Sequence, residues 1–549
     1  MRPSAPCRLF DCREDLTRRL PCERVFASSP VGPRVHGTWH SGGSTTHVRR
    51  IVCLAVALAA LVAGGRASAG IHDWLRYGGD DQLTNDAPSF LAPGLVAANL
   101  PSLAPVWTAN LDGAIVASPL YVRRARVNGH PVDVVYAATE AGSVYALRRS
   151  DGQTLWRRQL GTTLVCPDEA PGGRYGVSST PVIDLASRTL YVIGASGMLH
   201  ALDLGSGEER PGWPLALTPR PDAEYVWGGL TLAQGRLYVP FASYCDEPAP
   251  DGFFADGRLV AVDLAQQRVI ATFDVVPGPE NLGGIWGYGG TSVDPTDGTV
   301  WTATGNSWVY DPACDCIQEG VGSAESVVKL SPDLSLLDAD RPTGIPSPEV
   351  EDTDFGSTPL LFQPRGCPPL AAAHSKNGNV YVWLRSSLAT GPIWQARIGP
   401  DDLAHPFIGE PSWSAELQTL FIANARIYGP EGVVQFDAAA AFHVGDGCRF
   451  PDEPTWIADA GIGTKPPPLV VGNLLFIAGG EATALYVLNA SDGTVLEVLG
   501  LDGPAFSSPI LADGEVVVGD LSGRLHAFAV DGGCSAVSRR GFGGRTPCD

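Results

Sequence analysis

The lysines are the most informative cationic side chains of this sequence. Only three occur, whereas all the other members of its 38 Lys and Arg residues are arginines; the three are Lys329, Lys376 and Lys465. An ammonium is a compact point charge, unlike the planar guanidinium, so a lysine kept in an arginine-rich chain is a candidate for a specific contact. No nucleophile–base constellation of the kind that a hydrolase needs stands out.

The number of cysteines indicates disulfide bonds. Eight of the twelve follow residue 70, and these are Cys166, Cys245, Cys314, Cys316, Cys367, Cys448, Cys534 and Cys548. An even number in an exported chain favours disulfides. From their order along the chain we expect Cys166–Cys245, Cys367–Cys448 and Cys534–Cys548 pairs. Cys314 and Cys316 are more typical of a loop staple than of zinc, which would need a second Cys or His pair at ligand spacing.

The N-terminal region carries an export signal. Arg49-Arg50, an apolar stretch over residues 51–63 and the small residues 67–69 have the pattern of a signal peptide. The apolar stretch is too short to span a bilayer. We expect a mis-assigned extension over 1–47, a signal peptide over 48–69, one domain over 70–532 and a tail over 533–549. The mature protein is then periplasmic or secreted, with no integral membrane segment.

The charge excludes some partners. The formal net charge is −21, and residues 1–69 carry ten of the arginines against four acidic residues, so the remainder is more acidic still. A body this acidic repels phosphate backbones and anionic lipid surfaces. We therefore expect no nucleic-acid partner.

An internal repeat sets the architecture. The chain holds 65 Gly and 46 Pro, a composition typical of many short strands and turns. One strand motif of alternating apolar residues, with a glycine at its start in six copies and often an aspartate at its end, occurs eight times: at 142–147, 197–203, 257–263, 325–330, 378–384, 432–437, 484–489 and 523–529. Most copies follow a second alternating strand, such as VVYAAT or TLYVIGA. The spacing of about 40 to 70 residues suits four strands per repeat.

Such repeats predict an all-β protein, an eight-bladed β-propeller. A four-stranded blade cannot bury both faces alone, and radial packing lets each neighbour cover the next. The last copy ends near Ala529 without an outer strand. Residues 101–111, with Val106 and Trp107, are expected to supply that strand, so that the ring closes and exposes no sheet edge.

The repeats resemble those of a known family. Residues 142–156 are similar to the tryptophan-docking motif of pyrroloquinoline quinone (PQQ) dehydrogenases, and residues 74–80 (WLRYGGD) resemble the start of mature proteins in that group. The resemblance covers residues 72–530. It implies the quinoprotein dehydrogenase type of propeller, which also serves non-catalytic scaffolds.

The resemblance also implies a site. Residues 283–306 resemble the segment in which a tryptophan supports the quinone and an asparagine binds Ca²⁺, which makes Trp286 the platform and Asn306 a ligand. Residues 352–356 (DTDFG) resemble the segment of the catalytic base, Asp354, with Asp352 beside the cofactor. Residues 376–378 (KNG) resemble the segment whose lysine, Lys376, contacts the quinone oxygens.

Each residue type suits its implied role. A flat quinone stacks on an indole, a hard cation takes oxygen ligands, and a carboxylate accepts the proton of the substrate hydroxyl. Structural roles are the alternatives: Trp286 packed between blades, Asn306 in a left-handed turn, Asp352 and Asp354 capping a turn, and Lys376 in a hairpin turn.

The sequence departs from the enzyme pattern at three points. The family's glutamate ligand for Ca²⁺ lies two residues after a serine, where this chain has Cys245, so Asp246 or Glu247 are displaced candidates. The chain has no adjacent Cys-Cys pair, and no Cys-x-x-Cys-His, so we expect no haem c. Two hypotheses follow: an oxidoreductase that uses PQQ and calcium on an alcohol or sugar, and a propeller scaffold that binds protein or glycan partners.

Overall fold

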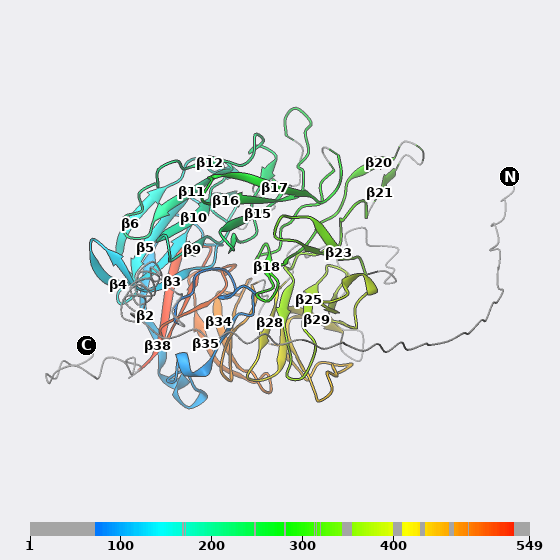
Figure 1. Cartoon of the computed structure of the whole chain (residues 1–549). Coiled ribbons are helices and arrows are strands. Elements are labelled where there is room, and N and C mark those ends of the chain that lie inside the picture. The colour runs from blue at the N-terminus through cyan, green and yellow to red at the C-terminus, as the bar shows by residue number, and fades with distance from the viewer. Residues whose placement is uncertain are drawn as a thin grey trace, which may run out of the picture. The chain divides into compact units, whose positions relative to one another are not determined.

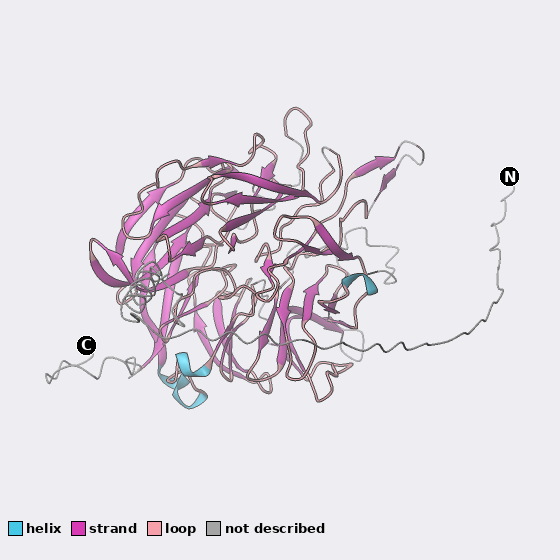
Figure 2. Cartoon of the chain, in the orientation of Figure 1, coloured by secondary structure: helices cyan, strands magenta, loops and turns pink. Residues whose placement is uncertain are grey.

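The computed structural model describes residues 72–531, without 167–169, 171, 246–248, 279–280, 312, 314–315, 319, 343–353, 399–408, 429–433, 460–465 and 481. Over this part the chain forms eight sheets of four or five strands arranged as the blades of a propeller (Figures 1 and 2). The described helices are three short 3-10 turns, η1 (Ser89–Leu91), η2 (Ala97–Ser102) and η3 (Leu388–Thr390). The predicted all-β eight-bladed propeller is confirmed.

Blades 1 to 4 follow one another along the chain. Blade 1 contains β3 (Leu120–Val127), β4 (His130–Ala138), β5 (Ser143–Arg148) and β6 (Thr154–Gln159). Blade 2 contains β9 (Val182–Asp184), β10 (Thr189–Ile193), β11 (Met198–Asp203) and β12 (Leu215–Ala216). Blade 3 contains β14 (Thr231–Ala233), β15 (Arg236–Ser243), β16 (Arg258–Asp263) and β17 (Arg268–Asp274), with β13 (Glu224–Tyr225) added to β15. Blade 4 contains β18 (Ser292–Val293), β19 (Val300–Ala303), β22 (Val327–Leu330) and β23 (Leu336–Asp340).

Blades 5 to 8 complete the ring. Blade 5 contains β24 (Leu360–Phe362), β25 (Leu370–His374), β26 (Asn379–Leu384) and β27 (Trp394–Arg397). Blade 6 contains β28 (Pro411–Ser414), β29 (Thr419–Tyr428), β30 (Val434–His443) and β31 (Trp456–Asp459). Blade 7 contains β32 (Leu469–Val471), β33 (Leu474–Ala478), β34 (Ala484–Asn489) and β35 (Val495–Gly500). Blade 8 contains β36 (Ile510–Ala512), β37 (Glu515–Gly519) and β38 (Arg524–Val530).

The repeated motif forms the third strand of every blade. The eight copies correspond to β5, β11, β16, β22, β26, β30, β34 and β38, each antiparallel to the strand before it. Apolar side chains on both faces of these strands are buried, because each face meets a neighbouring blade. The sequence motif therefore marks a strand that is largely buried between blades.

Blade 8 is completed from the start of the chain. β2 (Leu103–Asn110) pairs antiparallel with β38, and Trp107 lies opposite Ala527. The predicted closure by residues 101–111 is confirmed, and it covers the edge of the last sheet.

The tryptophans after the repeated strand join neighbouring blades. Trp156 of blade 1 donates its indole N–H to the carbonyl of Leu204 in blade 2 over 3.0 Å, and its ring lies against Gly207. Trp456 of blade 6 makes the same contact with Ala490, also at 3.0 Å, and with Gly493. The docking motif thus fixes the spacing between blades.

The N-terminal segment forms a belt, residues 72–87, that visits the blades in order. Its backbone hydrogen bonds join Trp74 to Tyr121, Leu75 to Ile183, Asp81 to Val293, Gln82 to Leu361, Thr84 to Trp413 and Asn85 to Val470. Blade 3 is reached by Arg76, which donates to the carbonyl of Leu232, and blade 8 by His72, whose Nδ1 lies 3.6 Å from Asp513. The belt ends as β1 (Asp86–Ala87), parallel to β32. It therefore ties the first strands of the blades together.

Two of the predicted disulfides are present. Cys166–Cys245 joins the loops before β8 (Arg174–Tyr175) and after β15, with Cα atoms 5.8 Å apart, and Cys367–Cys448 joins blades 5 and 6, with Cα atoms 5.5 Å apart. The predicted Cys534–Cys548 pair lies outside the described residues. None of the helices in the part of the chain that the structure describes is long and apolar enough to cross a membrane.

Candidate functional site

Three of the predicted site residues meet in one cluster. The Asp354 carboxylate accepts a hydrogen bond from the Trp286 indole N–H at 2.9 Å and pairs with the Lys376 ammonium at 3.0 Å. The same ammonium lies over the Trp286 ring, 4.8 Å from its centroid. The side chain of Asp354 is only 4% exposed and that of Lys376 is 11% exposed. A carboxylate, a cation and an indole therefore form one nearly buried unit.

Each member of this cluster comes from a loop at the start of a blade or between its strands. Trp286 precedes β18 and Asp354 precedes β24, while Lys376 lies in the turn between β25 and β26. The backbone N–H of Lys376 also donates to the Asp354 carbonyl at 2.9 Å, which fixes the two residues in register. Trp286 lies directly against Gly356, where a Cβ atom would be 2.4 Å from the ring. Glycine is required there because the indole needs that space.

Asn306 lies at the edge of the cluster. Its neighbour Gly305 is so close to Asp354 that a Cβ atom at Gly305 would be 3.1 Å from Asp354 Oδ2. Residues 305–308 pair antiparallel with residues 284–281 through the Gly305–Gly284, Asn306–Gly283 and Trp308–Asn281 backbone hydrogen bonds and the Ser307–Leu282 bridge. Blades 3 and 4 thereby hold Asn306 beside the loop that carries Trp286.

Glu410 positions the loops of the cluster. It precedes β28 and is 2% exposed, and its Oε1 accepts the backbone N–H groups of Gly289 at 2.9 Å and Thr358 at 3.0 Å. Burial raises the pKa of Glu410, although these hydrogen bonds oppose the shift. Since Gly289 follows Trp286 and Thr358 follows Asp354, this buried carboxyl joins the two loops. Sequence reasoning missed it, because nothing in Gly-Glu-Pro distinguishes it from a surface loop.

An aromatic cluster lies beside Trp286. Its members, with the Cys166–Cys245 disulfide among them, are Tyr77, Tyr175, Tyr225, Trp227, Tyr244, Tyr288 and Phe506. The rings of Tyr175 and Tyr225 stack with centroids 4.4 Å apart, and Trp227 meets Tyr288 edge-on at 6.3 Å. The loops that carry these residues come from different blades, so the cluster packs the region where blades converge.

Two hydroxyls of this region are buried without a hydrogen bond. No described atom is a hydrogen-bond partner of Tyr288 Oη or of Ser507 Oγ. A buried hydroxyl costs free energy unless a ligand or water completes its bonding. Tyr288 is two residues from Trp286, and Ser507 adjoins Phe506 of the same cluster. These hydroxyls are therefore suited to a bound polar group.

A second buried acid lies in the same region. Glu140, 1% exposed, accepts the Ser178 hydroxyl at 2.5 Å and the Gly176 N–H at 2.5 Å. The Tyr225 hydroxyl and Ser178 Oγ are 2.7 Å apart and share a hydrogen bond. Burial raises the pKa of Glu140 to about 8. One feature of the sequence could have pointed to Glu140: it is an acidic residue between two largely apolar strands, β4 and β5.

The remaining predicted site residues lie outside the described residues. They are Asp246, Glu247 and Asp352. The structure thus brings Trp286, Asp354 and Lys376 into contact and places Asn306 beside them, and the assignments of all seven as site residues stay predictions.

The described residues fit a planar quinone. An indole ring with an ammonium over it suits an anionic ring system, and the unbonded hydroxyl of Tyr288 offers a donor. The oxygen donors of Asn306 and Asp354, on neighbouring loops, suit a hard cation such as Ca²⁺. The donor chemistry therefore agrees with PQQ and calcium.

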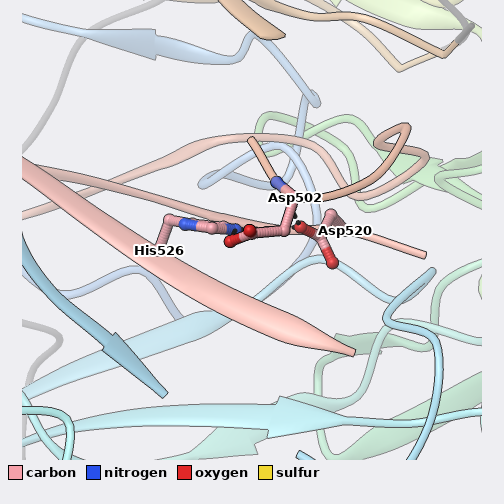
Figure 3. Close-up of side chains that lie close together, drawn as sticks. All are labelled: Asp502, Asp520 and His526. Atoms are coloured by element: carbon pink, nitrogen blue, oxygen red, sulfur yellow. Dashed lines mark hydrogen bonds and ion pairs between the residues drawn. The ribbon is translucent and has the colours of Figure 1, made fainter. Parts of the chain in front are cut away.

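A separate cluster of two aspartates and a histidine lies at blade 8, and its contacts are structural. Figure 3 shows Asp502, Asp520 and His526 close together, with His526 Nε2 2.9 Å from Asp520 and 3.8 Å from Asp502. Asp520 also accepts hydrogen bonds from Ser522 and the Arg524 backbone, and Arg524 pairs with Asp502. Burial opposes ionisation of Asp520, but the bonds from His526 and Ser522 hold its pKa below the usual value. These contacts join the loop between β35 and β36 to the turn between β37 and β38.

Comparisons with known proteins agree with this architecture. Residues 91–271 match the model of the outer membrane protein assembly factor BamB family, which carries PQQ-like repeats. A polyvinylalcohol dehydrogenase from a Pseudomonas species is 25% identical over 336 residues, 56% of this chain and 49% of that protein. BamB of Shewanella oneidensis is 49% identical over 61 residues, 11% of this chain and 15% of that protein. The chain thus matches half or less of the length of these relatives.

Solved structures share the fold. A quinohemoprotein alcohol dehydrogenase from Comamonas testosteroni is similar with a TM-score of 0.61 at 16% identity, over 84% of this chain and 81% of that chain. A europium-containing methanol dehydrogenase is similar with a TM-score of 0.62 at 15% identity, over 84% and 98% of the two chains. The chain is therefore an eight-bladed β-propeller with the fold of these dehydrogenases, and its residues 91–271 are similar to the BamB family.

Proposed function

We propose that this protein is an exported oxidoreductase that binds PQQ and calcium and oxidises an alcohol or sugar. The observation that supports the proposal most directly is the Asp354–Trp286–Lys376 unit, in which three loops of two blades meet at a nearly buried carboxylate. The 25% identity to a polyvinylalcohol dehydrogenase over 336 residues also supports it and favours a secondary alcohol as substrate.

The chain's own residues have distinct tasks in this proposal. Asp354 accepts the proton of the substrate hydroxyl at a carboxylate oxygen. Lys376 pairs with that carboxylate and offers its ammonium to the quinone oxygens, and Trp286 provides the face on which the ring lies. The bound quinone would supply the hydride acceptor. Burial of the unit excludes water, which strengthens each of these charge interactions.

Calcium would be held by oxygen donors. Asn306 supplies an amide oxygen, Asp354 a carboxylate oxygen, and Asp246 or Glu247 a further carboxylate. The Gly305–Gly284 and Asn306–Gly283 backbone bonds fix the backbone that carries this amide. Asp352 would complete the polar border of the cofactor.

Binding and turnover test the proposal separately. Calorimetry of the purified protein with PQQ and Ca²⁺ should show binding, which Lys376→Ala weakens at least tenfold. Asp354→Asn should still bind PQQ but lose about 10²-fold or more of the rate of alcohol-dependent dye reduction. Lys329→Ala is the matched control, because Lys329 also lies over a tryptophan, 5.2 Å from the Trp301 centroid, and near Asp297, but within blade 4.

A scaffold function is the alternative, and the match of residues 91–271 to the BamB family favours it. Identical titrations without heat for wild type and Lys376→Ala would refute the cofactor proposal and leave the scaffold. In either case we propose export through a signal peptide over 48–69 to the periplasm or the medium, which the two disulfides support.

A further inference from the structure

An aromatic pair of one exposed and one half-buried ring, Trp308 and Phe254, lies next to the candidate site. Trp308 is 49% exposed, which is unusual for the largest apolar side chain, and its ring is stacked on Phe254 with centroids 6.4 Å apart and an interplanar angle of 27°. Trp308 precedes the β20 (Val309–Asp311) and β21 (Cys316–Gln318) hairpin, which stands out from the ring in Figure 1. An exposed tryptophan ring that stacks on a second ring is typical of a binding surface, where tryptophan is enriched.

The backbone connects this pair to the Asp354 carboxylate. Residues 305–308 pair with 284–281, so the segment is extended. Gly305, at one end, touches Asp354, and Trp308 is three residues further on, at a distance of about 10 Å along an extended chain. Side chains alternate between the faces of such a segment. Ser307 is buried, whereas Asn306 is partly exposed and Trp308 exposed, so Asn306 and Trp308 lie on one face.

Phe254 comes from a loop that is held in place. Arg220 pairs with Asp251 at 2.8 Å and lies over the Phe253 ring, 4.1 Å from its centroid. The residues after Phe254 join the same segment as Trp308, because Asp256 forms a parallel bridge with Leu282. The pair is thus preorganised, which lowers the entropy cost of binding.

We propose that Trp308 and Phe254 form an outer subsite for an extended, uncharged polyol chain whose terminal or internal hydroxyl reaches Asp354. The proposal rests on the proposed function and specifies its substrate class. Aromatic rings bind the C–H faces of such a chain, and a separation of about 10 Å requires several repeat units between the platform and the carboxylate. The acidic protein, whose net charge is −21, disfavours anionic substrates.

A length series tests the subsite. Vinyl alcohol oligomers and maltooligosaccharides of increasing length are titrated by calorimetry into the protein without PQQ, and their KM values are measured with PQQ and Ca²⁺. In wild type, affinity should rise with length for one of the two series, which identifies the chain chemistry. Trp308→Ala and Phe254→Ala should each weaken binding of the longest oligomer up to about tenfold, in line with one lost aromatic contact, and flatten the dependence of KM on length.

Phe90→Ala is the matched control, because Phe90 is 65% exposed but lies in η1. It should leave both length series as in wild type. Affinity that is independent of length in wild type, or length series that Trp308→Ala and Phe254→Ala do not change, would overturn the subsite. A protein that binds long oligomers through Trp308 but oxidises no alcohol with PQQ and Ca²⁺ would keep the subsite and overturn the proposed function.

Discussion

Glu140 shows what burial does to a single residue. Its carboxyl is 1% exposed, and its pKa is raised to about 8, chiefly by desolvation. The protonated carboxyl is therefore favoured in the folded protein at neutral pH, with Ser178 Oγ and the Gly176 N–H as its hydrogen-bond partners. Burial of these hydrogen-bonded side chains costs less free energy while the Glu140 carboxyl is uncharged.

The stability of the protein should therefore fall as pH rises. Between the ordinary value of 4.5 and about 8, the folded Glu140 keeps its proton while the unfolded one loses it, so unfolding releases protons. This group alone lowers the free energy of unfolding by up to about 1.4 kcal/mol per pH unit in that window. Thermal melts of wild type and Glu140→Gln at pH 5, 6.5 and 8 measure the effect. Glu140→Gln should lose less stability toward pH 8, and parallel curves would contradict the assignment.

The sequence could predict some site residues because their types are rare or their motifs distinctive. Lys376 and Trp286 were found in this way, and the structure brings them to Asp354. Glu410 and Tyr288 could not be found, because their role depends on burial between blades, which no local pattern encodes. The belt likewise left no periodic signal, since each of its residues contacts a different blade.

The docking tryptophans determine how one element meets the next. Gly207 follows the repeated strand of blade 2, and a Cβ atom there would lie 2.6 Å from the Trp156 ring of blade 1. This contact explains why the sequence motif couples a glycine turn with a tryptophan: the glycine of one blade makes room for the indole of the previous one. The repeat could be predicted from sequence because both partners belong to it.

Gly207→Ala should destabilise the protein by about 1–3 kcal/mol more than Gly235→Ala, because only the first introduces an overpacked contact. Both glycines have a left-handed backbone, with φ of +67° and +76°, but nothing lies within 4 Å of a Cβ atom at Gly235. The second variant therefore measures backbone strain alone. Denaturant titration of both variants checks the difference, and equal midpoints would show that the indole moves aside without cost.

Closure of the whole ring depends on β2. Three truncated proteins, beginning at His72, Pro88 and Gly113, separate its role from that of the belt. The first keeps both, the second keeps β2, and the third leaves the edge of β38 uncovered. We expect the first to be monomeric, the second to be monomeric with a lower melting temperature, and the third to associate through its open edge. Size-exclusion chromatography and thermal melts distinguish them, and a monomeric third protein would show that closure by β2 is dispensable.

The pairing of β2 with β38 also has a consequence for the order of events during synthesis. Trp107 lies opposite Ala527, so β2, which is synthesised early, stays unpaired until β38 has been synthesised near the end of the chain. At about 5–20 residues per second, that wait lasts on the order of 20–80 s. Contacts this distant along the chain slow folding, and an unpaired strand invites association meanwhile. The belt that precedes β2 is suited to the delay, since its residues 78–86 (GGDDQLTND) are polar, acidic and rich in turn-forming residues.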